Sequence, residues 1–279
     1  DMADALEAAL EGIDGHLLPS LQALAGGLDR KAVEFADVLK SGRTHLMDAV
    51  PMMLGQEVSG WAEQVRKGIL RLQNARDSLL EMPVGGTALG TGINAPADFG
   101  KRMCAIIATM TGLPVREPAN RFEAMAARDA VVEMSAALKV LAVSLFKIAS
   151  DIRLLASGPR TGLGEISLPE LQPGSSIMPG KVNPVMPEMM MQVCAQGVGN
   201  DSAITVGGMY GTRNLNTMMP VMARNLLESI EILGNACRLL NDRCVSGGPE
   251  LPGNPDNTHG ITANRDRCRR YAEMSIMAV

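Results

Sequence analysis

The strongest constraint on this sequence is a long run of apolar residues at helical spacing. Its members lie alternately three and four residues apart, and they are Val131, Met134, Leu138, Leu141, Leu145, Ile148, Ile152 and Leu155. Steps of this kind place every member on one face of an α-helix. Because the pattern persists for more than three heptads, it predicts one long helix that is buried along its length.

Three further segments show the same spacing, and they are residues 54–79, 219–240 and 10–28. In the last of these, Gly12, Gly15 and Pro19 interrupt the pattern and weaken the helix prediction. A fifth helix is expected after Pro184, as far as about Val198. Runs that alternate every second residue are nearly absent, so the sequence predicts an all-α fold built as a bundle of long helices.

Composition excludes several classes of protein. The chain has 26 Lys and Arg against 30 Asp and Glu, so no basic excess indicates nucleic acid or an anionic membrane as a partner. No apolar run is long enough to span a membrane. The five cysteines form no C-x-x-C pair, which argues against a structural zinc site and a disulfide framework and favours a cytoplasmic location.

The loop of residues 174–184, GSSIMPGKVNP, carries the densest chemistry. It is not a Walker A phosphate loop, because Val182 stands where that motif needs Ser or Thr to bind magnesium. It does offer two adjacent hydroxyls, a cation, an amide and several backbone N–H groups that the flexible glycines leave available for hydrogen bonds. Such a set suits the binding of a carboxylate and the stabilisation of an oxyanion. The alternative is an ordinary surface loop between helices.

A second candidate is His45, in the segment SGRTHLMD of residues 41–48. A histidine beside Thr and Arg in a glycine-led loop can act as a general acid or base near neutral pH. A solvated loop histidine without function is the simpler alternative. Glu188 follows Pro184 near a helix start, where a carboxylate complements the helix dipole for purely structural reasons.

Taken together, these segments resemble the fumarase/aspartase superfamily. The loop GSSIMPGKVNP is similar to its signature. His45 in SGRTHLMDAVPMMLGQE, Gly86 in GGTALGTGIN and Gly180 in MPGKVNP resemble the class II fumarases, whereas aspartases carry Gln, Ala and Ala there. The similarity covers roughly residues 17–244. It implies a central five-helix domain that assembles into a tetrameric twenty-helix core, with active sites shared between subunits.

The resemblance also implies an activity, the reversible hydration of fumarate to L-malate, with no cofactor and no metal. Ser175 is then the base for the C3 proton, and His45 handles the proton at the hydroxyl side together with Glu188 of another subunit. Lys181 and Asn183 then hold a substrate carboxylate and stabilise the aci-carboxylate intermediate. The substrate-binding residues that the resemblance implies are Thr44, Ser176, Lys181, Val182 and Asn183.

Departures from the family pattern define the remaining expectations. The chain is expected to lack the N-terminal domain and most of the C-terminal domain, and therefore to be incomplete as a hydratase alone. We divide it into residues 1–243, the helical bundle with the candidate loops, and 244–279, a linker or insertion followed by a truncated C-terminal domain. The alternatives are an aspartase-like ammonia-lyase and a non-catalytic helical fragment that only oligomerises.

Overall fold

The computed structural model describes residues 2–158, 160–172, 177–178, 181–247 and 259–276. Helices account for most of these residues, which confirms the predicted all-α class. None of the helices in these ranges combines the length and the apolar composition that crossing a membrane requires. All five cysteines are free and buried.

All the predicted helices are present, and the one predicted over residues 10–28 is part of a longer helical stretch. The helices are α1 (Met2–Gly12), α2 (Leu18–Glu34), α3 (Leu54–Leu79), α4 (Phe99–Thr111), α5 (Arg121–Ala126), α6 (Asp129–Leu155), α7 (Val185–Gly208), α8 (Met219–Leu240) and α9 (Arg265–Ile276). The strands are β1 (Leu39–Thr44), β2 (Met47–Met53), β3 (Ile166–Ser167) and β4 (Thr262–Ala263). Two π-helical turns are η1 (Ile13–Leu17) and η2 (Asn241–Val245). Helices α4, α5 and α9 were not predicted from the sequence, and helix α7 continues past Val198, where the sequence pattern placed its end.

The apolar run of α6 is buried as its spacing predicts. All eight of its residues are buried, and the most exposed of them, Leu155, is only 5% accessible. Full burial of such side chains stabilises a fold by about 1.5–3 kcal/mol each. This helix is therefore held mainly by packing rather than by intrinsic helix propensity.

The weakest predicted helix is continuous but irregular. Between α1 and α2 the backbone makes the π-helical turn η1, which begins directly after Gly12 and contains Gly15. Pro19 lies in the first turn of α2, where its missing N–H matters least. The apolar face survives the irregularity, because Leu10, Ile13 and Leu17 are fully buried.

Cα packing divides the chain into two compact units. The first unit comprises Asp1–Pro19, Gly68–Val143 and Cys194–Gly234, and the second comprises Ser20–Lys67, Ser144–Val193 and Asn235–Val279. Helices α3, α6, α7 and α8 each contribute residues to both units. The predicted division between residues 243 and 244 falls inside η2 and stays a prediction. Most of the expected linker or insertion lies outside the described residues.

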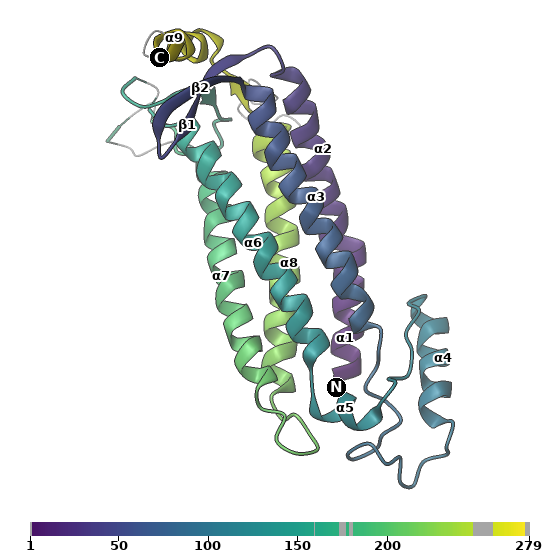
Figure 1. The fold of residues 1–279 in the computed structure, drawn as a ribbon. Helices are drawn as coiled ribbons and strands as arrows, with labels where there is room; N and C mark the ends of the chain where they lie inside the picture. Colours follow the sequence, from purple (N-terminus) through teal and green to yellow (C-terminus); the bar gives the residue numbers. More distant parts are fainter. Residues whose placement is uncertain (1, 159, 173–176, 179–180, 248–258, 277–279) are drawn as a thin grey trace. The chain divides into compact units, whose positions relative to one another are not determined.

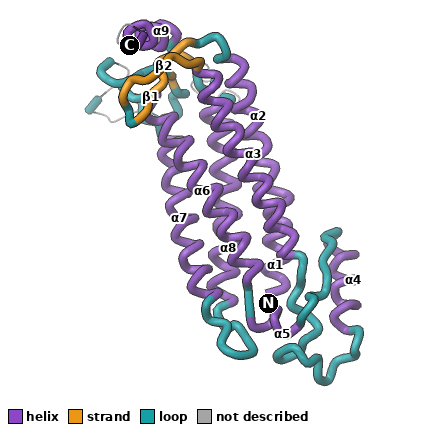
Figure 2. Tube along the Cα trace, viewed as in Figure 1, coloured by secondary structure: helices purple, strands orange, loops and turns teal. Residues whose placement is uncertain are grey.

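In the second unit, β1 and β2 form an antiparallel hairpin, and α9 packs against both strands (Figure 1). Strand β3 pairs with β4, which places Ile166 opposite Ala263. In the first unit, α4 and α5 lie in an otherwise irregular segment between α3 and α6 (Figure 2).

The hairpin replaces the glycine-led loop expected over residues 41–48. Its first strand buries Lys40, Ser41 and Gly42 in succession, so it lacks the apolar and polar alternation by which a strand is recognised. Charged and hydroxyl side chains take the place of an apolar face.

Candidate active site

The hairpin β1–β2 carries two of the predicted site residues, Thr44 and His45. Thr44 pairs with Met47, so His45 and Leu46 form a two-residue turn. Their φ angles are +55° and +63°, the positive values that a type I′ turn requires, although such turns favour asparagine and glycine. This backbone is strained for a bulky side chain. Thr44, His45 and Leu46 are all exposed, so the turn presents them to solvent.

An irregularity in the hairpin lies next to this turn. The strand register shifts between Ser41 and Arg43, so Gly42 faces an extra residue of β2. A Cβ atom at Gly42 would lie 2.7 Å from the carbonyl oxygen of Val50, which is too close for any other residue. Glycine at this position therefore allows the register that places Arg43 opposite Asp48 and Thr44 opposite Met47.

A buried cluster of charges lies beneath the hairpin. Glu165, which has no exposed surface, has one carboxylate oxygen 2.8 Å from Nη1 of Arg43 and the other 3.1 Å from Nζ of Lys40. Lys40 also bonds to Glu57 of α3. Lys40, Arg43 and Glu165 were not predicted from the sequence as site residues. Their spacing in the sequence does not indicate that they are buried together, because charged residues in polar segments usually face solvent.

The signature loop is described only in part. Ser175 and Ser176, the predicted base and its substrate-binding neighbour, lie outside the described residues. Lys181 is exposed, whereas Val182 and Asn183 are half-buried. The carbonyl oxygen of Asn183 accepts a hydrogen bond of 2.8 Å from the backbone N–H of Val185, so this residue is fixed at the start of α7.

Glu188 lies in the first turn of α7, where its carboxylate complements the helix dipole. Within this chain it forms an ion pair with Arg153 of α6, with 3.4 Å between Nε and Oε1. Both side chains are partly solvent-exposed, so the pair contributes little to stability. The expected partnership of Glu188 with His45 of another subunit stays a prediction.

A cavity of about 250 Å³ joins the described end of the signature loop to strand β3. Lys181, Val182 and Asn183 line it together with Ile166 and Ser167. Glu170 also lines it, so the cation, amide and hydroxyl that suit a small carboxylate share the cavity with one protein carboxylate. Thr44 and His45 do not line this cavity, so the single chain brings together only one half of the predicted site.

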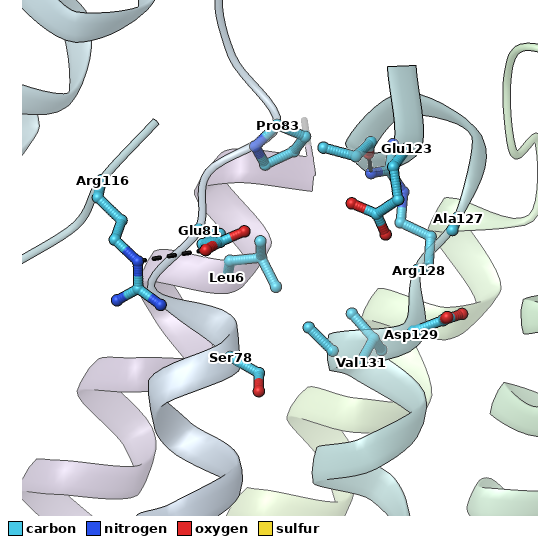
Figure 3. A pocket seen from close by; sticks show the side chains of 12 residues that line it. Leu6, Ser78, Glu81, Pro83, Arg116, Glu123, Ala127, Arg128, Asp129 and Val131 are labelled. Carbon is cyan, nitrogen blue, oxygen red and sulfur yellow. Dashed lines mark hydrogen bonds and ion pairs between the residues drawn. The ribbon is translucent and has the colours of Figure 1, made fainter. Parts of the chain in front are cut away.

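A second cavity, of about 220 Å³, belongs to the first unit (Figure 3). Arg116 pairs with Glu81 across 3.3 Å, and Glu123 and Asp129 also line it. Arg128 in its wall is buried, which lowers the pKa of its guanidinium. Three carboxylates against two guanidinium groups do not favour an anionic substrate, and no predicted site residue lies here.

The sequence pattern of a family described as lyase matches residues 4–199. The chain belongs to this lyase family. The recognised resemblance is confirmed by curated relatives named fumarate hydratase class II. The protein of Mycobacterium tuberculosis is 54% identical over 96% of this chain and 54% of its own length. That of Ralstonia nicotianae is 48% identical over 98% of this chain and 56% of its own length.

Solved structures of lyases have the same fold. The class II fumarase of Schistosoma mansoni matches with a TM-score of 0.92 and 33% identity, over 99% of this chain and 58% of that one. A Brucella melitensis protein described as fumarate lyase:delta crystallin, bound to cobalt, matches with a TM-score of 0.90 and 41% identity, over 99% and 57%. The chain thus spans about half the length of the lyases that it matches.

Proposed function

We propose that the protein containing this chain catalyses the reversible hydration of fumarate to L-malate. The observation that carries the proposal is the cavity in which Lys181 and Asn183 meet at the start of α7, in a chain similar to class II fumarate hydratases. In the dehydration direction, a base removes the C3 proton and an acid protonates the departing C2 hydroxyl, which leaves as water. The steps use protein side chains alone.

Ser175 is the proposed base, and Ser176 binds substrate beside it. Removal of the C3 proton places a second negative charge on the adjacent carboxylate, which becomes an aci-carboxylate. The ammonium of Lys181 and the amide of Asn183 stabilise this charge, and Val182 completes that wall of the cavity. His45, together with Glu188 of another subunit, protonates the leaving hydroxyl, while Thr44 contacts the substrate.

We further propose a homotetramer in which each active site is shared between subunits. Helix α6 exposes Val140, Val143, Phe146 and Leu154 although its opposite face is buried, so it is apolar nearly all round. Such a helix is expected to be covered by another chain. Light scattering at micromolar concentration tests this, because a stable, well-folded monomer would contradict it. The cytoplasmic location stays a prediction.

The activity test measures loss of fumarate and formation of malate. The 279-residue chain is assayed alone and after mixing with a separately produced N-terminal fragment of the Mycobacterium tuberculosis relative. We expect little activity alone and hydration after mixing. Ammonia release from aspartate by the mixture would support the aspartase-like alternative instead. An oligomer with neither activity would support the non-catalytic helical fragment.

A further inference from the structure

The main chain of Glu165 is fixed at three points within the second unit. Its N–H donates to the carbonyl oxygen of Leu155 at 2.9 Å, and its own carbonyl oxygen accepts from the N–H of Asn264 at 2.8 Å. The Cys268 thiol donates to the same carbonyl oxygen across 3.4 Å. The end of α6, the start of α9 and strand β3 are thus tied together at this residue, which makes it a firm reference point.

The side chain of Glu165 holds two cations of one strand. Lys40 and Arg43 are three residues apart, and residues at that distance in a regular strand face opposite sides. Both nevertheless reach the same carboxylate, next to the irregular register at Gly42. Arg43 donates a hydrogen bond to Oε1 and so fixes the rotation of β1, whereas Lys40 contributes an ion pair to Oε2, which accepts no hydrogen bond from the described residues.

The apolar side chains at the tip of the hairpin are exposed and do not anchor it by burial. Leu46, Met47 and Val50 are 71%, 70% and 68% exposed. Hydrophobic burial therefore does not determine where the strained His45–Leu46 turn points. Arg43 is the last partly buried residue before the turn, and its guanidinium lies over the ring of Tyr271, 5.6 Å from the ring centre.

We propose that Glu165 is a positioning residue for the two halves of the active site. Through Arg43 it fixes the turn that carries Thr44 and His45, and through the next residue, Ile166, it supports the wall of the cavity that contains Lys181. This inference rests on the proposed hydratase function. Glu165 has no exposed surface, so it acts through the residues that it holds and not on the substrate directly.

Buried charges are a costly way to stabilise a fold. Removing a carboxylate and an ammonium from water requires several kcal/mol per ion, and apolar replacements of similar volume are often as stable. Ion pairs do, however, fix both distance and direction, and the planar guanidinium of Arg43 contacts Glu165 through Nη1 and Asp48 through Nε. The desolvation of this cluster costs free energy, and the cluster lies next to a strained, exposed turn. Its role is therefore to fix the position of that turn.

The test uses Glu165→Asp, which keeps the charge but shortens the side chain by one methylene, so that it cannot reach both cations. Glu63→Asp is the matched control, because Glu63 pairs with Arg66 at 3.0 Å in an exposed position on α3. Kinetics are measured on the preparation that hydrates fumarate, and binding is measured with succinate, a saturated dicarboxylate that cannot be hydrated. Hydrogen exchange of the hairpin amides is measured on the 279-residue chain.

We expect Glu165→Asp to lower kcat about tenfold or more while the Kd for succinate changes about twofold, because small misplacements of catalytic groups reduce turnover more than binding. Exchange should accelerate over residues 39–53 and not over residues 226–240. Glu63→Asp should change none of these. Arg43→Lys, which keeps the charge and loses the fork, should repeat the pattern, and it replaces Glu165→Asp if that variant does not fold.

A folded variant with unchanged kcat, or with kcat and succinate affinity lowered equally, would overturn the positioning role. Failure of the mixture that contains the unsubstituted chain to hydrate fumarate would instead count against the hydratase function. In that case the exchange measurement still decides the inference, because unaltered protection of residues 39–53 in Glu165→Asp would show that Glu165 does not hold the hairpin.

Discussion

Arg43 and Glu165 are separated by 122 residues in the sequence, yet their side chains form an ion pair of 2.8 Å. The pair joins the β1–β2 hairpin to the segment that leads toward the signature loop. Lys40 extends it to Glu57 of α3, so the charges form a chain of alternating sign. The local order of the candidate site therefore depends on electrostatic contacts that are protected from solvent.

Lys40→Met tests this dependence through stability. The methionine keeps the apolar stem of the side chain but leaves Glu165 with one cation fewer in a buried position. We expect the free energy of unfolding in urea to fall by about 3–5 kcal/mol. Arg66→Met is the control, since its pair with Asp29 is exposed and should cost about 1 kcal/mol or less. Equal, small losses in both variants would contradict the prediction.

Leu46→Gly tests the strain in the turn. Leu46 is 71% exposed and has a positive φ, so glycine removes strain without removing packing. We expect an increase in the free energy of unfolding of about 0.5–1 kcal/mol. Leu70→Gly, at an exposed site inside α3, should have the opposite sign and cost about 1 kcal/mol. Chemical denaturation measures both, and a loss of stability at Leu46 would show that the turn is relaxed.

Gly42→Ala tests the register of the hairpin. The added Cβ would meet the carbonyl oxygen of Val50, so the strands must separate or the register must change. We expect a loss of about 1–3 kcal/mol, as for other overpacked sites. Gly60→Ala is the control, because nothing lies within 4 Å of its added Cβ and alanine favours the helix. The midpoint temperature of thermal unfolding should fall for Gly42→Ala and rise for Gly60→Ala.

The proposed mechanism predicts an order of catalytic effects in the reconstituted hydratase. Ser175→Ala should lower turnover by about 10²–10⁴-fold, because it removes the C3 base. Lys181→Met should be as severe, since it removes the charge that faces the aci-carboxylate. His45→Asn should lower turnover less, because Glu188 and water can partly replace it. Near-normal fumarate hydration by Ser175→Ala would refute the assigned base.

Cys244 predicts part of the alkaline stability profile. Burial raises its pKa from the ordinary 9.0 to about 12. The folded state therefore keeps a proton that the unfolded state releases above pH 9, so this contribution is complete below pH 9 and is lost as the pH rises toward 12. Between these two pH values the free energy of unfolding falls by about 1.4 kcal/mol for each pH unit.

Urea unfolding of the protein and of Cys244→Ala between pH 8 and pH 10.5 measures this contribution, since the difference between the two proteins removes the titration of other groups. We expect the variant to be less stable at pH 8 because of the cavity. It should lose less stability on going to pH 10.5. Parallel profiles would show that the Cys244 thiol does not contribute.

The long helices were predictable because their information is local and repeated. Eight apolar residues at steps of three and four define the buried face of α6, and no distant residue is needed to recognise it. The extension of α7 beyond Val198 was missed, because helix ends depend on capping and packing more than on periodicity. The resemblance carried by GSSIMPGKVNP was recognisable for the same local reason.

The sequence by itself therefore determined the helical class, the main helices, the relationship to class II fumarases and the candidate residues of the signature loop. Only the tertiary structure decided that residues 39–53 form a hairpin, that Glu165 lies between Lys40 and Arg43, and that Glu188 pairs with Arg153 within the chain. The physical reason is that charges have no periodic signature. Whether a charge is solvated or buried depends on partners that can lie far away in the sequence, as Glu165 does from Lys40 and Arg43, and folding alone brings those partners together.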